Sequence, residues 1–107
     1  MKPLLLDENL PTDLRLHFSS DFEVFTVKYC GWSALQNGKL LTSMKEDGFY
    51  ALITADKNLQ FQQNLDKYGV KVVVLNCNNT LLTELIPFVA LVEQELKSES
   101  SSLAIVI

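Results

Sequence analysis

The sequence predicts an α/β fold in which helices cover both faces of a mostly parallel sheet, a three-layer α/β/α sandwich. Five short apolar segments alternate with segments of helical periodicity, the order typical of parallel strands joined by helices. The 107 residues are enough for one hydrophobic core and too few for two domains of ordinary size. We therefore expect a single domain over residues 1–107.

The first quarter of the chain predicts two strands joined by a helix. Leu4–Leu6 is a short apolar run ended by polar residues, which is typical of a buried strand. A helix is expected next, because a proline stands near its first turn and apolar residues follow at four-residue steps, at Leu10, Leu14 and Phe18. Glu23–Val27 is β-branched and aromatic, and it predicts the second strand.

A second helix and a third strand are expected in the middle of the chain. Asn37 is a good helix N-cap, and Gly48 is a good residue to end the same helix. The buried face of this helix would carry three apolar residues, Leu40, Leu41 and Met44. Ala51–Thr54 is apolar and ends in a polar loop, so it predicts the third strand.

The remaining half predicts two more helices and two more strands. Asn58 is expected to cap a short helix that carries Leu59 and Leu65, and Lys71–Leu75 is the clearest central strand. A long amphipathic helix follows from Thr80, which Pro87 is expected to kink or divide. The serine-rich residues 98–102 predict a linker, and the apolar residues 103–107 a fifth strand, paired in its own sheet with a homodimer contact on it or on the long helix.

Charge and cysteine content restrict the class of protein. The net charge is −4, Arg15 is the single arginine, and no segment concentrates basic residues. A general electrostatic grip on nucleic acid is therefore not expected, because phosphate binding uses clustered cations. Cys30 and Cys77 form no CxxC pair, as is typical of thiols in a reducing cytoplasm. Neither a membrane span nor a signal peptide is expected, since no apolar run approaches about 20 residues.

Acidic residues follow two of the expected strands. Asp7 and Glu8 come directly after the first strand, and Asp56 comes two residues after the third. The carboxyl ends of neighbouring parallel strands meet at one edge of the sheet, where ligands bind near a switch in strand order. Carboxylates there can bind Mg²⁺ or Mn²⁺, and such an ion activates water and stabilises charge on a phosphodiester. Asn58 would add a neutral oxygen ligand, or would only cap a helix.

Two other interpretations of these residues deserve comparison. Acidic and amide residues after a strand are also ordinary turn and cap residues, which need no ligand. A phosphoacceptor receiver domain has acids at similar spacing, but it also needs Ser or Thr after the fourth strand and Lys after the fifth. This chain has Asn76 and Cys77 at the first place and no lysine at the second, so the receiver interpretation is the less favoured. His17 is the only histidine, so a nucleophile–histidine pair has no support.

Three motifs, in the same order along the chain, resemble those of a known family. They are LLLDENLP at Leu4–Pro11, GWSALQNGKLL at Gly31–Leu41 and LITADKNLQFQQNL at Leu52–Leu65. Together they resemble the small bacterial PIN-like domains, compact relatives of the PIN-domain ribonucleases and predicted toxins of toxin–antitoxin pairs. The resemblance implies a PIN-like parallel α/β/α sandwich and a Mg²⁺-dependent endoribonuclease, with RNA as substrate and a small helix-turn-helix antitoxin as partner.

The resemblance also implies roles for individual residues. Asp7 and Asp56 would be the metal-binding acids, with Glu8 assisting and Thr54 as the hydroxyl neighbour of Asp56. Many relatives have further acids at two positions where this chain has amides, Asn37 and Asn58. In an active enzyme these amides would orient water or phosphate. The alternative function is a weakened PIN-like module that binds a protein partner or RNA without cleaving it.

Overall fold

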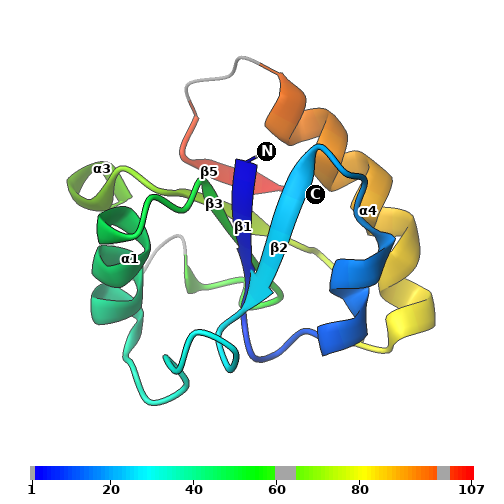
Figure 1. Ribbon diagram of the computed structural model, residues 1–107. Coiled ribbons are helices and arrows are strands. Elements are labelled where there is room, and N and C mark those ends of the chain that lie inside the picture. Colours follow the sequence, from blue (N-terminus) through cyan, green and yellow to red (C-terminus); the bar gives the residue numbers. More distant parts are fainter. Residues whose placement is uncertain (1, 60–64, 99–101) are drawn as a thin grey trace.

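The computed structural model describes residues 2–59, 65–98 and 102–107, which form an α/β fold around a five-stranded, all-parallel sheet (Figure 1). The strands are β1 (Lys2–Leu6), β2 (Phe22–Thr26), β3 (Ala51–Thr54), β4 (Lys71–Val74) and β5 (Ala104–Val106). All five expected strands are confirmed, with ends that differ by at most two residues from the expected ranges. The spatial order is β2-β1-β3-β4-β5, so β1 lies between β2 and β3.

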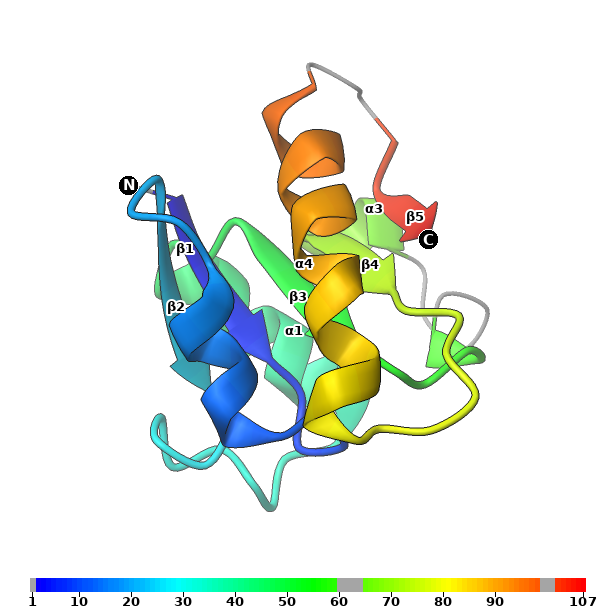
Figure 2. The same ribbon diagram turned by 90° about the vertical axis from the view of Figure 1, so that its right-hand side faces the viewer.

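Helices cover both faces of this sheet, which agrees with the expected layered arrangement. The 3₁₀ helix η1 (Thr12–His17) and α4 (Leu82–Lys97) lie on one face, and α1 (Asn37–Glu46) and α3 (Leu65–Tyr68) lie on the other (Figure 1 and Figure 2). No helix within the described residues is long and apolar enough to cross a membrane.

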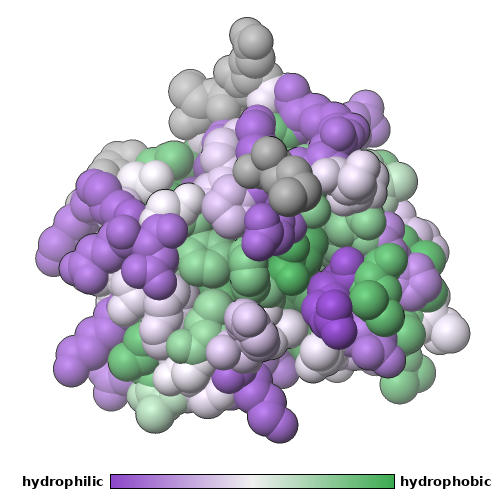
Figure 3. Space-filling model, viewed as in Figure 1, coloured by the Kyte–Doolittle hydropathy of each residue, from purple (hydrophilic) through white to green (hydrophobic). Residues whose placement is uncertain are grey.

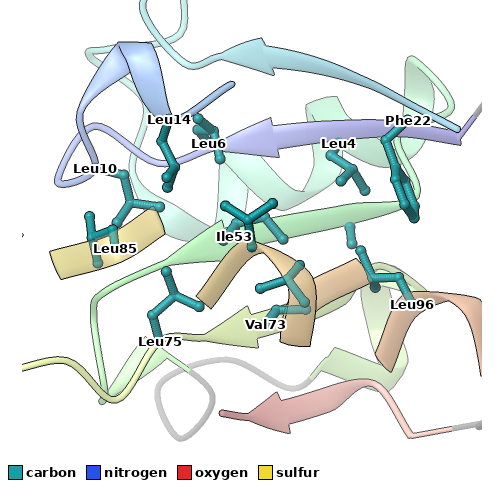
Figure 4. Packing of buried hydrophobic residues seen from close by; sticks show 13 residues of the cluster. Leu4, Leu6, Leu10, Leu14, Phe22, Ile53, Val73, Leu75, Leu85 and Leu96 are labelled. Carbon is teal, nitrogen blue, oxygen red and sulfur yellow. The ribbon is translucent and has the colours of Figure 1, made fainter. Parts of the chain in front are cut away.

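The core is divided by the sheet into two apolar clusters. Successive side chains of a strand point to opposite faces, so Leu4 and Leu6 of β1 belong to the cluster under α4, whereas Leu5 belongs to the cluster under α1. Figure 4 shows the first cluster, in which Leu85 and Leu96 of α4 pack on the same side of the sheet as the β1 leucines. Because both faces are covered, the central strands are apolar without alternation, as their sequences indicated.

The helix that connects β1 to β2 is a short 3₁₀ helix, which is more tightly wound than an α-helix. Residues 12–17 form a 3₁₀ helix, and Phe18 already has extended backbone angles. The apolar face was predicted correctly, since Leu10 and Leu14 are buried and Phe18 packs partly against the same cluster. The chain must enter β2 at Phe22, so it has room for only a short helical piece after β1.

Helix α1 ends as predicted but begins one residue earlier than expected. Gln36 occupies the N-cap position and Asn37 is the first helical residue, so the expected capping role of Asn37 is wrong. At the other end Gly48 has a φ of +79°, and the N–H groups of Gly48 and Phe49 donate to the carbonyls of Lys45 and Met44. This is a Schellman motif, which favours glycine because a side chain is strained in left-handed backbone.

Helix α4 is continuous through Pro87, so the predicted division of this helix is wrong. Its buried face carries four apolar residues at three- and four-residue steps, Leu85, Val89, Val92 and Leu96. Pro87 has no N–H, so the carbonyl of Thr83 receives no helical hydrogen bond from it. Both residues are exposed, so this carbonyl lies on the side of the helix that faces solvent. Packing of the apolar face therefore outweighs the loss of one backbone hydrogen bond.

Strand β5 pairs with β4 inside the sheet, as expected for the apolar carboxyl-terminal segment. The N–H of Val72 donates to the carbonyl of Leu103 at 2.7 Å, and at the other end of the same ladder Ile107 bonds to Val74 and Asn76. Most of the expected linker, residues 99–101, lies outside the described residues. The short helix expected after Asn58 falls mainly on residues 60–64, which also lie outside them, and α3 begins at Leu65.

Candidate functional site

The candidate site lies at the carboxyl ends of β1 and β3, the neighbouring strands at which the strand order switches. The chain passes from β1 outward to β2, and then returns across β1 to β3. The two loops that leave the sheet here diverge to opposite faces, and this divergence is what leaves room for a ligand in doubly wound folds. Asp7 directly follows β1 and Asp56 is the second residue after β3, so both expected acids lie at this edge.

The Thr54 side chain connects the two loops. Thr54 is the last residue of β3 and is 0% exposed, and within the described residues it is the only polar side chain in the buried class. Its hydroxyl donates to Oδ2 of Asp7 at 2.8 Å and accepts from the backbone N–H of Asp56 at 3.0 Å. Since both partners bond to one oxygen, Asp7 Oδ2 and the Asp56 nitrogen lie within about 6 Å of each other.

Asn9 completes this network, and its role was missed at the level of the sequence. Its side-chain amide donates to the Thr54 hydroxyl oxygen at 3.3 Å, and its Oδ1 accepts from the backbone N–H of Ala55 at 3.2 Å. The Thr54 hydroxyl thus uses its one proton and both lone pairs, which is its full hydrogen-bonding capacity. The only available signal was the position of Asn9, two residues after Asp7 in the same short loop.

Backbone hydrogen bonds hold the first loop against β3. The N–H of Asp7 donates to the carbonyl of Ile53 at 2.9 Å, and the N–H of Leu10 donates back to the carbonyl of Asp7 at 3.0 Å. The second carboxylate oxygen of Asp7 accepts from the N–H of Glu8 at 2.9 Å. Asp7 is half-buried with both oxygens hydrogen-bonded, so its carboxylate has a fixed orientation toward the edge of the sheet.

Asp56 rather than Asn58 supplies the side chain that organises the second loop. Oδ1 of Asp56 accepts from the backbone N–H of Asn58 at 3.0 Å, and its carbonyl accepts from the N–H of Leu59 at 3.3 Å. This is the local turn that the structural interpretation of Asp56 anticipated. The Asn58 side chain is exposed. The turn uses Oδ1 of Asp56, and a carboxylate has a second oxygen, so a turn role and a ligand role are compatible.

Glu8 lies beside Asp7 of this network, whereas Asn37 lines a different hollow. Glu8 is exposed, and it lines with Asp7 a hollow of 110 Å³ between the loop after β1 and the end of β2. Asn37, at the start of α1, lines a separate open hollow of 570 Å³ with Lys67 and Tyr68. A shared site of Asn37 with the two acids therefore stays a prediction.

The donor set fits a hard divalent cation with few protein ligands. Within the described residues no group of three or more His, Cys, Asp and Glu side chains is placed to hold an ion. The protein ligands would be the carboxylates of Asp7 and Asp56, and Mg²⁺ is typically held by one or two carboxylates while it keeps several waters. The buried Thr54 hydroxyl fixes the Asp7 carboxylate and the backbone of Asp56, and the Asp56 carboxylate is held by the N–H of Asn58.

Comparison with known proteins found no relative of this chain. The chain matches no family model, no curated protein and no solved structure. Its function is therefore inferred from the side chains at the β1–β3 edge.

Proposed function

We propose that the protein is a Mg²⁺-dependent endoribonuclease of the PIN-like type. The observation that carries this proposal is the hydrogen-bonded network of Asp7, Thr54 and Asp56 at the carboxyl ends of adjacent parallel strands. A polar network that joins two such loops favours a ligand site over two unrelated turns, because Thr54 of β3 fixes the Asp7 carboxylate and Asn9 of the first loop bonds the backbone before Asp56.

Each residue of the network has a defined task in this proposal. The carboxylates of Asp7 and Asp56 would hold the ion, and a bound Mg²⁺ or Mn²⁺ activates water and neutralises charge on the phosphodiester. The Thr54 hydroxyl fixes the Asp7 carboxylate, and Asn9 fixes Thr54. Glu8 is exposed beside Asp7 and would assist the attacking water. Hydrolysis adds water to phosphorus as one P–O ester bond breaks, which leaves a phosphate end and a hydroxyl end.

The test is cleavage of a mixed pool of single-stranded RNA by the purified protein with and without Mg²⁺ or Mn²⁺. We expect Asp7→Asn and Asp56→Asn each to lower the metal-dependent rate by at least about 100-fold, because each removes a charged ligand. Glu95→Gln is the matched control, since it removes an exposed acid from the far end of α4. Full activity in either site variant, with unchanged folding by circular dichroism, would exclude this mechanism.

A binding module without cleavage is the second candidate function. It is favoured by the small number of acids at the candidate site. The described residues hold no cluster of three metal-binding side chains, and the amides Asn37 and Asn58 stand where the resembled family has acids. If those amides have weakened a metal site, the double variant Asn37→Asp and Asn58→Asp should bind Mn²⁺ more tightly. Calorimetric titration measures this directly, and an unchanged affinity would place both positions outside the site.

The proposed biological setting is the toxin of a toxin–antitoxin pair that acts in the cytoplasm. Cys30 and Cys77 are free thiols, as suits a reducing compartment. Induced expression in a bacterial host should slow growth, and Asp7→Asn should relieve the effect if cleavage causes it. A small helix-turn-helix protein encoded beside this chain would be the expected antitoxin.

A further inference from the structure

A second hollow continues from the candidate site along the edge strand β2. It has a volume of 350 Å³ and is lined by Thr12, Arg15, Val24, Phe25, Thr26 and Tyr29. Thr12 and Thr26 also line the smaller hollow that contains Asp7 and Glu8. The two hollows therefore adjoin each other, and we call them together the β2 groove, which lies between η1 and the outer edge of the sheet.

The surface of the β2 groove combines an exposed aromatic ring with positive charge. Tyr29 is 78% exposed, and its ring contacts that of Phe25 with centroids 5.9 Å apart. Arg15 is exposed on the opposite wall, and Lys28 lines the part of the groove nearest to Asp7. Figure 3, which views the molecule from the side of β2, shows hydrophobic surface at the centre of this face with hydrophilic residues around it.

The combination of an exposed aromatic ring with a cation favours a nucleic-acid strand over an acidic peptide or a second copy of this chain. The 350 Å³ hollow has no carboxylate in its lining, although the whole chain has a net charge of −4. Its one charged lining residue is therefore a cation, Arg15, and the carboxylates of Asp7 and Glu8 line only the smaller hollow, beyond Thr12 and Thr26. An exposed aromatic ring beside a guanidinium is the combination that single-stranded nucleic acid uses for stacking and phosphate contact.

We propose that the β2 groove binds single-stranded RNA and leads it to the acidic edge. One base would stack on Tyr29, with Phe25 supporting the ring, and the adjacent phosphate would pair with Arg15. The backbone then passes Thr12 and Thr26 and reaches Asp7, where Lys28 offsets part of the acidic charge. This inference deepens the proposed nuclease function and rests on it, but it concerns binding rather than cleavage.

The experiment measures binding of a short fluorescein-labelled single-stranded RNA of mixed sequence by fluorescence anisotropy. An Asp7→Asn background keeps the RNA intact, and the second substitution is then made in the groove. We expect Tyr29→Ala to weaken binding by at least about fivefold, and Tyr29→Phe to bind as the background does, because stacking needs the ring and not the hydroxyl. Tyr29 is exposed, so neither variant should disturb folding.

A salt series tests the role of Arg15. Arg15→Gln should lower the slope of log affinity against log salt concentration by about 0.7, the value for one phosphate contact on a single strand. Lys45→Gln is the matched control, since it removes an exposed cation from the last turn of α1. Double-stranded RNA of the same sequence should bind more weakly, because its bases are not free to stack.

The outcomes separate this inference from the proposed function. If the Asp7→Asn protein binds RNA and the Tyr29 and Arg15 variants bind it equally well, the groove proposal is wrong and the nuclease proposal is untouched. If the groove variants lose binding but the unmodified protein never cleaves RNA, the groove stands and the nuclease proposal fails. No binding of single-stranded RNA even at low salt would overturn the groove proposal and would leave this face to a protein partner.

Discussion

At the scale of single residues, Thr54 is the side chain on which the candidate site depends. It is fully buried, and its hydroxyl bonds to groups from both loops, Asp7 and Asn9 on one side and Asp56 on the other. Exposed turn acids would not need such a partner. The buried hydroxyl therefore has two effects that can be measured separately, one on stability and one on the orientation of the acids.

We predict that Thr54→Val lowers the free energy of unfolding by about 1–3 kcal/mol, because three hydrogen bonds lose their common partner in a buried place. Thr54→Ser keeps the hydroxyl and should recover most of the hydrogen bonding. Urea unfolding of the three proteins measures the difference. In a cleavage assay Thr54→Val should also reduce activity more than Thr54→Ser does. Equal stability of the valine variant and the unmodified protein would mean that the network is incidental.

At the scale of elements, polar contacts on the surface connect the last turns of α4 to the segment before β2. Lys97, in the last turn of α4, pairs with Asp21 just before β2 at 2.8 Å, and Ser19 hydrogen-bonds to Glu93 of the same helix. The Lys97 side chain hydrogen-bonds to Asp21 and, with its charge, lowers the pKa of that carboxyl, while Asp21 raises the pKa of Lys97. Both side chains are more than half exposed, so water screens the pair.

The lowered pKa of Asp21 predicts a pH dependence of definite sign. The pair contributes stability above the pKa that Asp21 has in the unfolded chain, and this contribution is lost as the pH falls through the lower folded pKa. Asp21→Asn should therefore be slightly less stable than the unmodified protein at neutral pH, and equally stable in strong acid. Salt should shrink the neutral difference. Urea unfolding across this range tests it, with Asp13→Asn as the control for loss of an exposed acid.

At the scale of the whole molecule, the last strand at one edge of the sheet is β5, which comes from the carboxyl-terminal segment. β5 covers β4, and Ile105 and Ile107 pack partly against the α4-side cluster. β5 is the last strand in the order, so among the described residues no strand pairs with its outer edge. Val106 of β5 is 54% exposed, and Leu91 of α4 is 48% exposed. These are the places where the predicted homodimer contact would form.

We predict that deletion of residues 103–107 lowers both stability and solubility. It would remove the backbone hydrogen bonds of Val72, Val74 and Asn76 to this segment and expose the edge of β4. The loss should be at least about 2 kcal/mol, from the apolar area of two half-buried isoleucines. Thermal melting and light scattering measure stability and mass, and a dimer formed at β5 should become a monomer. A truncated chain with unchanged melting and mass would show that the segment is a passive extension.

Much of the fold could be predicted because the local signals agree with the tertiary structure. Ala51–Thr54 is a strand over the predicted range, and Gly48 ends α1 with the left-handed backbone that glycine favours. Predictions from a single residue were wrong where the packing or the hydrogen bonds of the helix favoured another outcome. Pro87 indicated a break, yet α4 continues through it because four buried side chains lie on one face of the helix. The cap of α1 is Gln36, since the N–H of Leu40 already donates to the carbonyl of Gln36 and so makes Asn37 the first helical residue.

The amino-acid sequence by itself determined which acids follow which strands, since Asp7 is the first residue and Asp56 the second residue after an apolar run. Only the tertiary structure decided that they belong to one network, because the hydrogen bonds of Thr54 and Asn9 connect residues more than 40 positions apart. The β2 groove has the same origin. Arg15, Phe25 and Tyr29 carry no common local signal, and they line one surface because β2 returns beside β1 and places η1 along its edge. Such contacts depend on chain topology, which local propensity does not encode.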